Sequence, residues 1–108
     1  MTTTTVPDLR TIPATALGAP GAPDPARCSL VAIEALARSA GQGLRLTSIA
    51  LDVASHPLSP GEVAIRTIVD KRSRSIVFAS IDARLGNQLV FSAQGLFSGP
   101  GVAGRAKP

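Results

Sequence analysis

Two different periods of apolar residues divide the sequence. Between residues 30 and 40, apolar side chains recur at spacings of three and four, which places them on one face of a helix. The members of this face are Leu30, Ile33, Leu36, Ala37 and Ala40. From residue 46 onward the period changes to two, which is typical of strands with one buried face. The pattern therefore predicts a helix followed by a sheet.

Local signals mark both ends of the predicted helix. Asp24 suits the N-cap, where its side chain can accept hydrogen bonds from backbone N–H groups. Pro25 suits the first helical position, where no donor is needed. Gly41 and Gly43 are typical of a helix end. Because many residues between these limits are alanines, the helix is slim and can approach a sheet closely.

Four segments with a period of two follow the helix, over residues 46–54, 62–69, 76–84 and 88–97. In the first, Thr47, Ile49, Leu51 and Val53 form one face. Three short connections joining four consecutive strands predict an antiparallel meander. A single helix is too little to supply the crossovers of a parallel sheet. We therefore expect an α+β fold with one central helix packed on a four-stranded antiparallel sheet.

The two ends of the chain differ from this central part, which we expect to form one domain over residues 24–98. Residues 1–23 form an arm rich in Pro, Thr and Ala, whose prolines forbid a continuous helix or a central strand. Short extended pieces such as Asp8–Ile12 are still allowed. Residues 99–108 are expected to be a flexible tail.

A chain of 108 residues is long enough for one domain. A monomer of this size buries roughly 60–70% of its unfolded surface, so burial of further surface by a partner subunit would increase its stability. The chain has no Trp, no Tyr and 3 Phe. Aliphatic side chains must therefore build most of the core.

The chain is basic, with 11 Lys and Arg against 7 Asp and Glu. Modules that bind nucleic-acid strands interleave their cations with stacking aromatic residues. Because those aromatics are missing, we do not expect a nucleic-acid partner. The charge suits a small phosphorylated ligand or has no specific role.

Compartment signals point to the cytoplasm. Cys28 is the only cysteine, so no intrachain disulfide can form, which suits a reducing compartment. The threonine run Met1–Val6 lacks the features of a secretion signal. No stretch approaches the roughly 20 apolar residues that a membrane span requires. We expect a cytoplasmic protein without a membrane partner.

Three motifs carry a resemblance to a known family. The helical segment Ala32-Ile33-Glu34-Ala35-Leu36-Ala37 resembles a pattern of small, apolar and acidic residues in hotdog-fold acyl-CoA thioesterases of the phenylacetate and 4-hydroxybenzoyl-CoA types. The stretch His56–Glu62 is similar to the strand-to-strand turn of that family, and Val69–Arg74 is similar to its basic hairpin. The likeness runs from residue 29 to residue 98. It implies a hotdog fold and a thioester ligand.

The resemblance assigns the catalytic carboxylate to Glu34, which would attack the thioester carbonyl or activate a water beside it. Partial burial beside the apolar stripe would raise the basicity of this carboxylate and suit general-base chemistry. The alternative is a solvated glutamate on a helix flank. Ser29 is the second catalytic candidate, because its hydroxyl would join backbone amides at the helix N-terminus as donors to an oxyanion. Its alternative is an ordinary first-turn residue.

By the same resemblance, Lys71, Arg72, Ser73 and Arg74 would meet the phosphates of coenzyme A, which enters as part of the substrate and not as a separate cofactor. Arginine is well shaped for phosphate. The alternative is a solvated turn between strands. A metal site is not expected, because one His and one Cys do not make a ligand set. We expect Cys28 to be a buried, inert thiol.

One departure from the family concerns the helix entry. A His-Gly-Gly turn, whose amides polarise the thioester carbonyl, is replaced here by Asp24-Pro25-Ala26-Arg27, and the proline removes one amide. Two hypotheses follow: an acyl-CoA thioesterase-like protein that hydrolyses or binds a small acyl-CoA thioester, and a non-catalytic hotdog module for acyl-ligand binding or oligomeric assembly. Either is expected as a homodimer or a dimer of dimers. Nucleic-acid binding by the basic hairpin ranks third.

Overall fold

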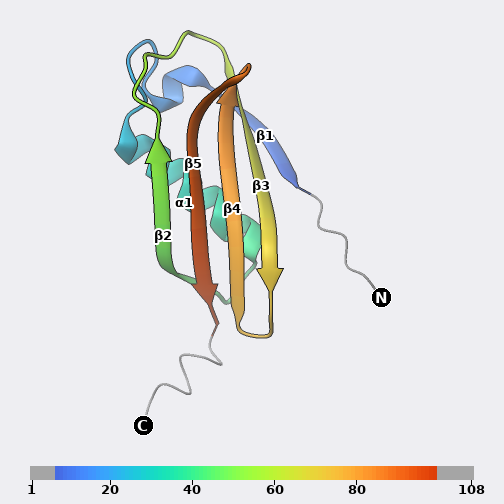
Figure 1. Ribbon diagram of the computed structural model, residues 1–108. Helices are drawn as coiled ribbons and strands as arrows, with labels where there is room; N and C mark the ends of the chain where they lie inside the picture. The colour runs from blue at the N-terminus through green and yellow to red at the C-terminus, as the bar shows by residue number, and fades with distance from the viewer. Residues whose placement is uncertain (1–6, 100–108) are drawn as a thin grey trace.

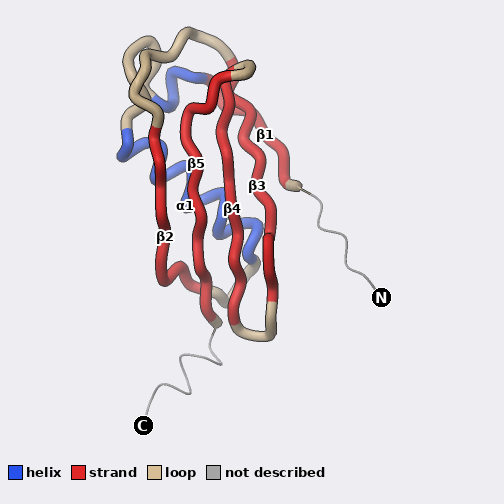
Figure 2. Tube along the Cα trace, in the orientation of Figure 1, coloured by secondary structure: helices blue, strands red, loops and turns tan. Residues whose placement is uncertain are grey.

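The computed structural model describes residues 7–99. One helix lies against one face of a five-stranded antiparallel sheet (Figure 1; Figure 2). The elements in chain order are β1 (Asp8–Pro13), a 3₁₀ turn η1 (Ala14–Leu17), α1 (Pro25–Ala40), β2 (Arg45–Val53), β3 (Glu62–Arg72), β4 (Ile76–Leu85) and β5 (Gln88–Ser98). The expectations for Met1–Val6 and for the tail beyond Gly99 lie outside the described residues.

The limits of α1 confirm the prediction from the sequence, but the capping hydrogen bond expected from the Asp24 side chain is absent. Asp24 is the N-cap and Pro25 the first helical residue. At the other end Gly41 has a φ of 107°, in the left-handed region that favours glycine, and its N–H donates to the carbonyl of Ala37 at 3.2 Å. Residues at the two ends of the helix therefore set its limits.

The buried face of α1 differs from the predicted one. The buried residues are Cys28, Ala32, Ala35, Leu36 and Ala40, whereas Leu30 is 69% exposed. The helix carries apolar residues on two adjoining faces, so its periodicity is compatible with either face being buried. In the structure, the face with the smaller residues packs against the sheet. The predicted stripe was therefore wrong for Leu30 and Ala37 and right for Leu36 and Ala40.

The sheet has five strands and not four. The additional strand, β1, comes from the segment predicted as an arm, where an extended piece had been allowed. It pairs with the first half of β3, from Asp8 opposite Thr67 to Pro13 opposite Glu62. A proline can end a strand at the sheet edge because no further ladder bond is needed there.

The predicted meander holds for β3, β4 and β5 but was wrong for β2. The strand order is β1-β3-β4-β5-β2, so β2 pairs with β5 at the far edge of the sheet. The connection over residues 54–61 crosses the end of the sheet instead of making a tight turn (Figure 1). Its Leu58 is 2% exposed, and the Leu58 N–H donates to the Gly21 carbonyl at 3.0 Å. Burial of the Leu58 side chain in the core fixes the position of the crossing segment.

A bulge in β2 changes which side chains face the helix. Leu46 pairs with Phe97 and Ser48 with Leu96, so Thr47 is the extra residue. The Thr47 hydroxyl donates to the Leu96 carbonyl at 3.0 Å, and Thr47 is exposed. The expectation that Thr47 shares the buried face was therefore wrong.

The helix packs on β5 at Gly95, which has no side chain. A Cβ built on Gly95 would lie 3.2 Å from Cδ1 of Leu36 and 3.3 Å from Cδ1 of Leu46. Below the helix, Phe91 and Phe97 are the largest buried side chains, and aliphatic residues fill the rest of the core. The small helix face and the glycine together let the two layers approach closely.

Candidate functional site

The first turn of α1 has backbone amides that no side chain caps. The Asp24 side chain makes no capping hydrogen bond, although Asp24 occupies the N-cap position. The amides of Ala26 and Arg27 have no carbonyl partner within the helix, because the first N–H groups of any helix lack one. By contrast, the Cys28 N–H donates to the Asp24 carbonyl at 2.9 Å. The Cys28 amide is therefore already used within the helix.

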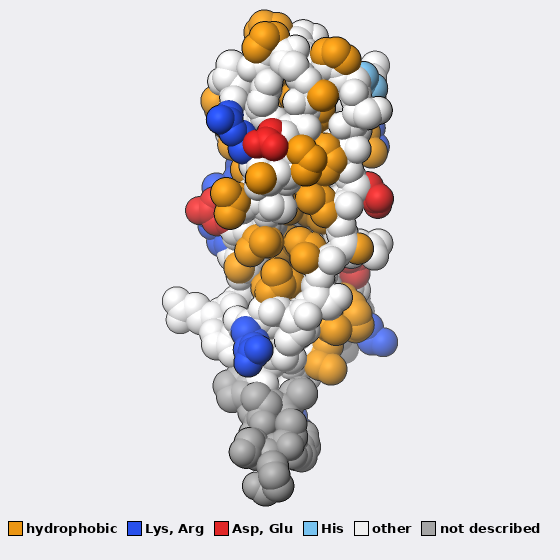
Figure 3. Space-filling model, turned by 90° about the vertical axis from the view of Figure 1, so that its left-hand side faces the viewer, with side chains coloured by type: hydrophobic (Ala, Val, Ile, Leu, Met, Phe, Trp, Pro, Cys, Tyr) orange, Lys and Arg blue, Asp and Glu red, His pale blue; other side chains and the backbone are white. Residues whose placement is uncertain are grey.

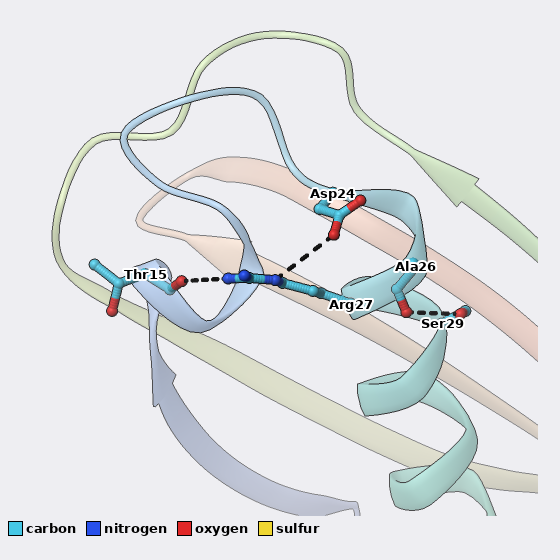
Figure 4. A network of polar contacts seen from close by, with 5 residues as sticks. All are labelled: Thr15, Asp24, Ala26, Arg27 and Ser29. Carbon is cyan, nitrogen blue, oxygen red and sulfur yellow. Dashed lines mark hydrogen bonds and ion pairs between the residues drawn. The ribbon is translucent and has the colours of Figure 1, made fainter.

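Side chains around this turn are held in place by polar contacts (Figure 4). Nε of Arg27 lies 3.6 Å from Oδ2 of Asp24, and its Nη1 donates to the Thr15 carbonyl at 3.4 Å. The Ser29 hydroxyl donates to the Ala26 carbonyl at 2.9 Å. Arg27 thus ties the helix start to η1. The Ser29 hydroxyl has an acceptor within the helix, as an ordinary first-turn serine does.

Glu34 lies in the middle of α1 and points away from the sheet. Its side chain is 75% exposed, and Oε2 lies 3.7 Å from Nη2 of Arg38 one turn later. An exposed pair of this kind contributes little to stability. Within a single chain, the carboxylate therefore lacks the desolvation expected beside the apolar stripe.

The apolar flank of α1 next to Glu34 is open. Leu30 lies one turn before Glu34 and is exposed. The helix runs obliquely across the sheet, with its first turns toward the β2 edge and its last turn, which carries Arg38 and Ser39, toward β1 and β3 (Figure 1). Apolar side chains gather along the β2 side of the molecule (Figure 3). On β2, the helix-facing side chains Ile49 and Leu51 are only half-buried.

The basic turn predicted to meet coenzyme A lies at the opposite end of the helix. Arg72 donates from Nη1 to the Ala40 carbonyl at 3.0 Å and from Nη2 to the Ser39 carbonyl at 3.3 Å. The Ser73 hydroxyl donates to the Ile76 carbonyl at 3.3 Å and closes the turn. Arg72 therefore caps the C-terminus of α1.

The other two residues of that turn are exposed. Lys71 follows the extra residue Asp70 of a bulge in β3, and it lines a hollow on the face of the sheet away from the helix. Arg74 lies at the tip of the turn. Both side chains can therefore reach an anion.

Sequence reasoning missed a polar hollow of about 310 Å³ on the outer face of the sheet. Asp52, Ser92, Asp82 and Arg66 stand side by side there on four neighbouring strands, since each is the register partner of the next. Small side chains on the adjoining row, among them Ser80, keep the hollow open. The available signal was the set of polar residues that alternate with apolar ones in each strand. These residues can be assigned to one site only after the order of the strands is known.

Cys28 and His56 have no common site. Cys28 is fully buried, and burial, with a smaller contribution from Asp24, raises the pKa of its thiol to about 11. The prediction of a buried thiol is confirmed. His56 is exposed, and its Nδ1 lies 2.7 Å from Nε2 of Gln88. Residues 7–99 contain no group of three His, Cys, Asp or Glu side chains that could hold a metal ion.

Comparison with solved structures assigns the architecture. A thioesterase from Haemophilus influenzae superposes with a TM-score of 0.71 at 18% identity, over 85% of this chain and 70% of that one. A conserved protein from Pseudomonas aeruginosa gives 0.67 at 14% identity, over 87% and 79%. A phenylacetic acid degradation-related protein from Ralstonia eutropha gives 0.67 at 13% identity, over 87% and 75%. The protein has the hotdog fold.

The likeness to these hotdog proteins is one of fold, since no protein-family model and no curated protein matches the sequence. Within the hotdog domain, Ser29 and Glu34 lie on one helix, and the turn over residues 71–74 lies at the other end of that helix from Ser29. A single chain thus does not bring all the predicted site residues together. No helix among the described residues is long and apolar enough to cross a membrane.

Proposed function

We propose that this hotdog protein hydrolyses a small acyl-CoA thioester, with Glu34 as the carboxylate that activates water. The proposal rests on the position of Glu34, which stands beside an open apolar flank on the helix whose first turn has uncapped amides. A water deprotonated by Glu34 attacks the carbonyl carbon, the C–S bond breaks, and the departing thiolate of coenzyme A takes a proton. The amides of Ala26 and Arg27 would stabilise the oxyanion.

Helix geometry supports a site shared between two copies. Ala26 and Glu34 are eight positions apart, which is about 12 Å along one helix. One thioester carbonyl cannot meet both groups of the same chain at hydrogen-bond distance. A second copy packed in antiparallel orientation would place the Glu34 of one chain near the helix start of the other.

The β2 edge is the expected place for that second copy. An edge strand offers unpaired backbone groups, and pairing two such edges would satisfy them. The same contact would cover Leu30 and the half-buried side chains of β2, and would desolvate Glu34. We therefore expect a homodimer, or a dimer of dimers, in which burial by the partner makes the carboxylate a better base.

Glu34→Gln tests the catalytic role. We expect the purified protein to release free thiol from acyl-CoA substrates across a panel of small acyl groups, and the variant to be slower by about 10²-fold or more, the range for a lost general base. Thiol release is followed with a colorimetric thiol reagent. The same substitution at the exposed Glu62, at the start of β3, is the matched control and should leave the rate unchanged.

Thiol release that Glu34→Gln does not slow would remove the proposed mechanism. Loss of activity in both variants alike would also contradict a specific role for Glu34.

Pro25 favours the second candidate function, a non-catalytic hotdog module that binds an acyl ligand or serves only in assembly. This residue removes one amide from the helix start, where an oxyanion would otherwise gain a donor. A protein of this kind should be thermally stabilised by CoA esters without turnover. Absence of both turnover and stabilisation would favour a purely structural role.

A further inference from the structure

A pocket of about 300 Å³ lies beneath the C-terminal half of α1, at the β1 side of the sheet. It is lined by Asp8 at the start of β1, Thr67 and Val69 on β3, and Arg38 and Ser39 on the helix. This depression opens to solvent on one side and is large enough for a small organic molecule.

Two polar atoms in this pocket are buried and make no hydrogen bond. Thr67 is 1% exposed, and its hydroxyl makes no hydrogen bond among the described residues. Oδ2 of Asp8 is also a buried atom without a hydrogen bond there, although the Asp8 side chain as a whole is 40% exposed and Nε of Arg10 lies 3.9 Å from this oxygen. The two residues are direct register partners, so their side chains stand next to each other on the helix side of the sheet. Native proteins rarely leave such groups unsatisfied.

The charges around the pocket differ in sign. An ionised carboxylate only accepts hydrogen bonds, so a ligand at Asp8 must present a donor, whereas the Thr67 and Ser39 hydroxyls can donate or accept. Arg38 presents a guanidinium on the helix side, and Nε of Arg10 lies 3.9 Å from Oδ2 of Asp8. A ligand that satisfies both kinds of group carries a hydroxyl or ammonium beside a carboxylate.

We propose that this pocket binds a small hydroxy or amino carboxylate. The hydroxyl or amino group donates to Asp8 and meets Thr67, and the carboxylate accepts from Arg38. Arg38 also pairs with Glu34, at 3.7 Å, so the bound carboxylate competes for the same guanidinium. The binding itself does not depend on the thioesterase proposal, because none of its contacts involves Glu34.

Binding is tested by calorimetry and thermal melting of the intact protein with glycolate, L-lactate, glycine and L-serine. Acetate and ethanolamine serve as probes that carry only one of the two groups. We expect at least one bifunctional compound to bind with a Kd of about 1 mM or below, and both single-group probes to bind at least tenfold more weakly. Equal binding of acetate, or no binding of any bifunctional compound, would overturn the proposal.

Thr67→Val separates a ligand site from an ordinary buried hydroxyl. The variant keeps the shape of the side chain and removes the unpartnered hydroxyl, so it should raise the Tm of the ligand-free protein while weakening binding at least tenfold. Asp8→Asn should also weaken binding, and Thr11→Val, at an exposed position of the same strand β1, should change neither quantity. A lower Tm in Thr67→Val would mean that water already satisfies the hydroxyl, and this result would contradict the proposal.

Discussion

At the scale of single residues, Cys28 places the first turn of α1 in the hydrophobic core. Its side chain is fully buried, and the pKa of the thiol is raised to about 11 from an ordinary value of 9.0. The fold therefore favours the neutral thiol. A neutral thiol packs as a small hydrophobe and is a poor nucleophile.

The raised pKa of Cys28 predicts a loss of stability in base. Between pH 9 and 11 the unfolded chain loses the thiol proton and the folded chain keeps it, so unfolding becomes easier as pH rises. At pH 10.5 this contribution is about 2 kcal/mol. We expect urea unfolding to show a fall of that size between pH 8 and 10.5 that is absent from Cys28→Ala. Parallel pH profiles for the two proteins would contradict the prediction.

At the scale of elements, α1 is held at its C-terminal end by a side chain from β3. Arg72 donates to two of the last carbonyls of the helix, which would otherwise lack partners. A cation at this end also interacts favourably with the helix dipole. The sequence suggested phosphate binding for Arg72, and that role stays a prediction.

Arg72→Met should lower the free energy of unfolding by about 1–2 kcal/mol, because two helix carbonyls lose a charged donor. Arg74→Met is the matched control, since Arg74 is exposed in the same turn. Urea denaturation of both variants measures the difference. If the two variants lose equal stability, the capping contacts of Arg72 are not important in solution.

At the scale of the whole molecule, the two edges of the sheet differ. The β1 edge adjoins the polar pocket, whereas the β2 edge adjoins the open apolar flank of α1 (Figure 3). Exposed apolar surface of this kind marks an interaction site more often than it marks free surface. The asymmetry favours the β2 edge as the dimer contact.

Leu30→Lys should convert the dimer to a monomer and remove thioester hydrolysis together with it. The reason is that a lysine in the proposed contact would bury an unpaired charge. Leu9→Lys is a matched control, because Leu30 and Leu9 are 69% and 68% exposed and Leu9 lies on β1. Light scattering coupled to gel filtration gives the mass of each variant. A dimer that persists in Leu30→Lys would place the contact elsewhere.

The sequence by itself determined the helix limits, the four later strands and the antiparallel pairing of β3, β4 and β5. Each of these depends on signals within one segment, such as Asp24-Pro25 before the helix, Gly41 after it, and alternation within a strand. The candidate Glu34 came from a motif of the same local kind, and the catalytic role that we propose for it requires the proposed second copy.

Only the tertiary structure decided the strand order, the entry of β1 into the sheet and the buried face of the helix. The crossing of residues 54–61 depends on where Leu58 can be buried, which no local pattern encodes. Leu30 belonged to one of two apolar stripes that the helix sequence allows, and packing against the sheet buried the stripe with the smaller residues. Asp8 and Thr67 become neighbours only when distant strands pair, so their pocket had no signal in the sequence.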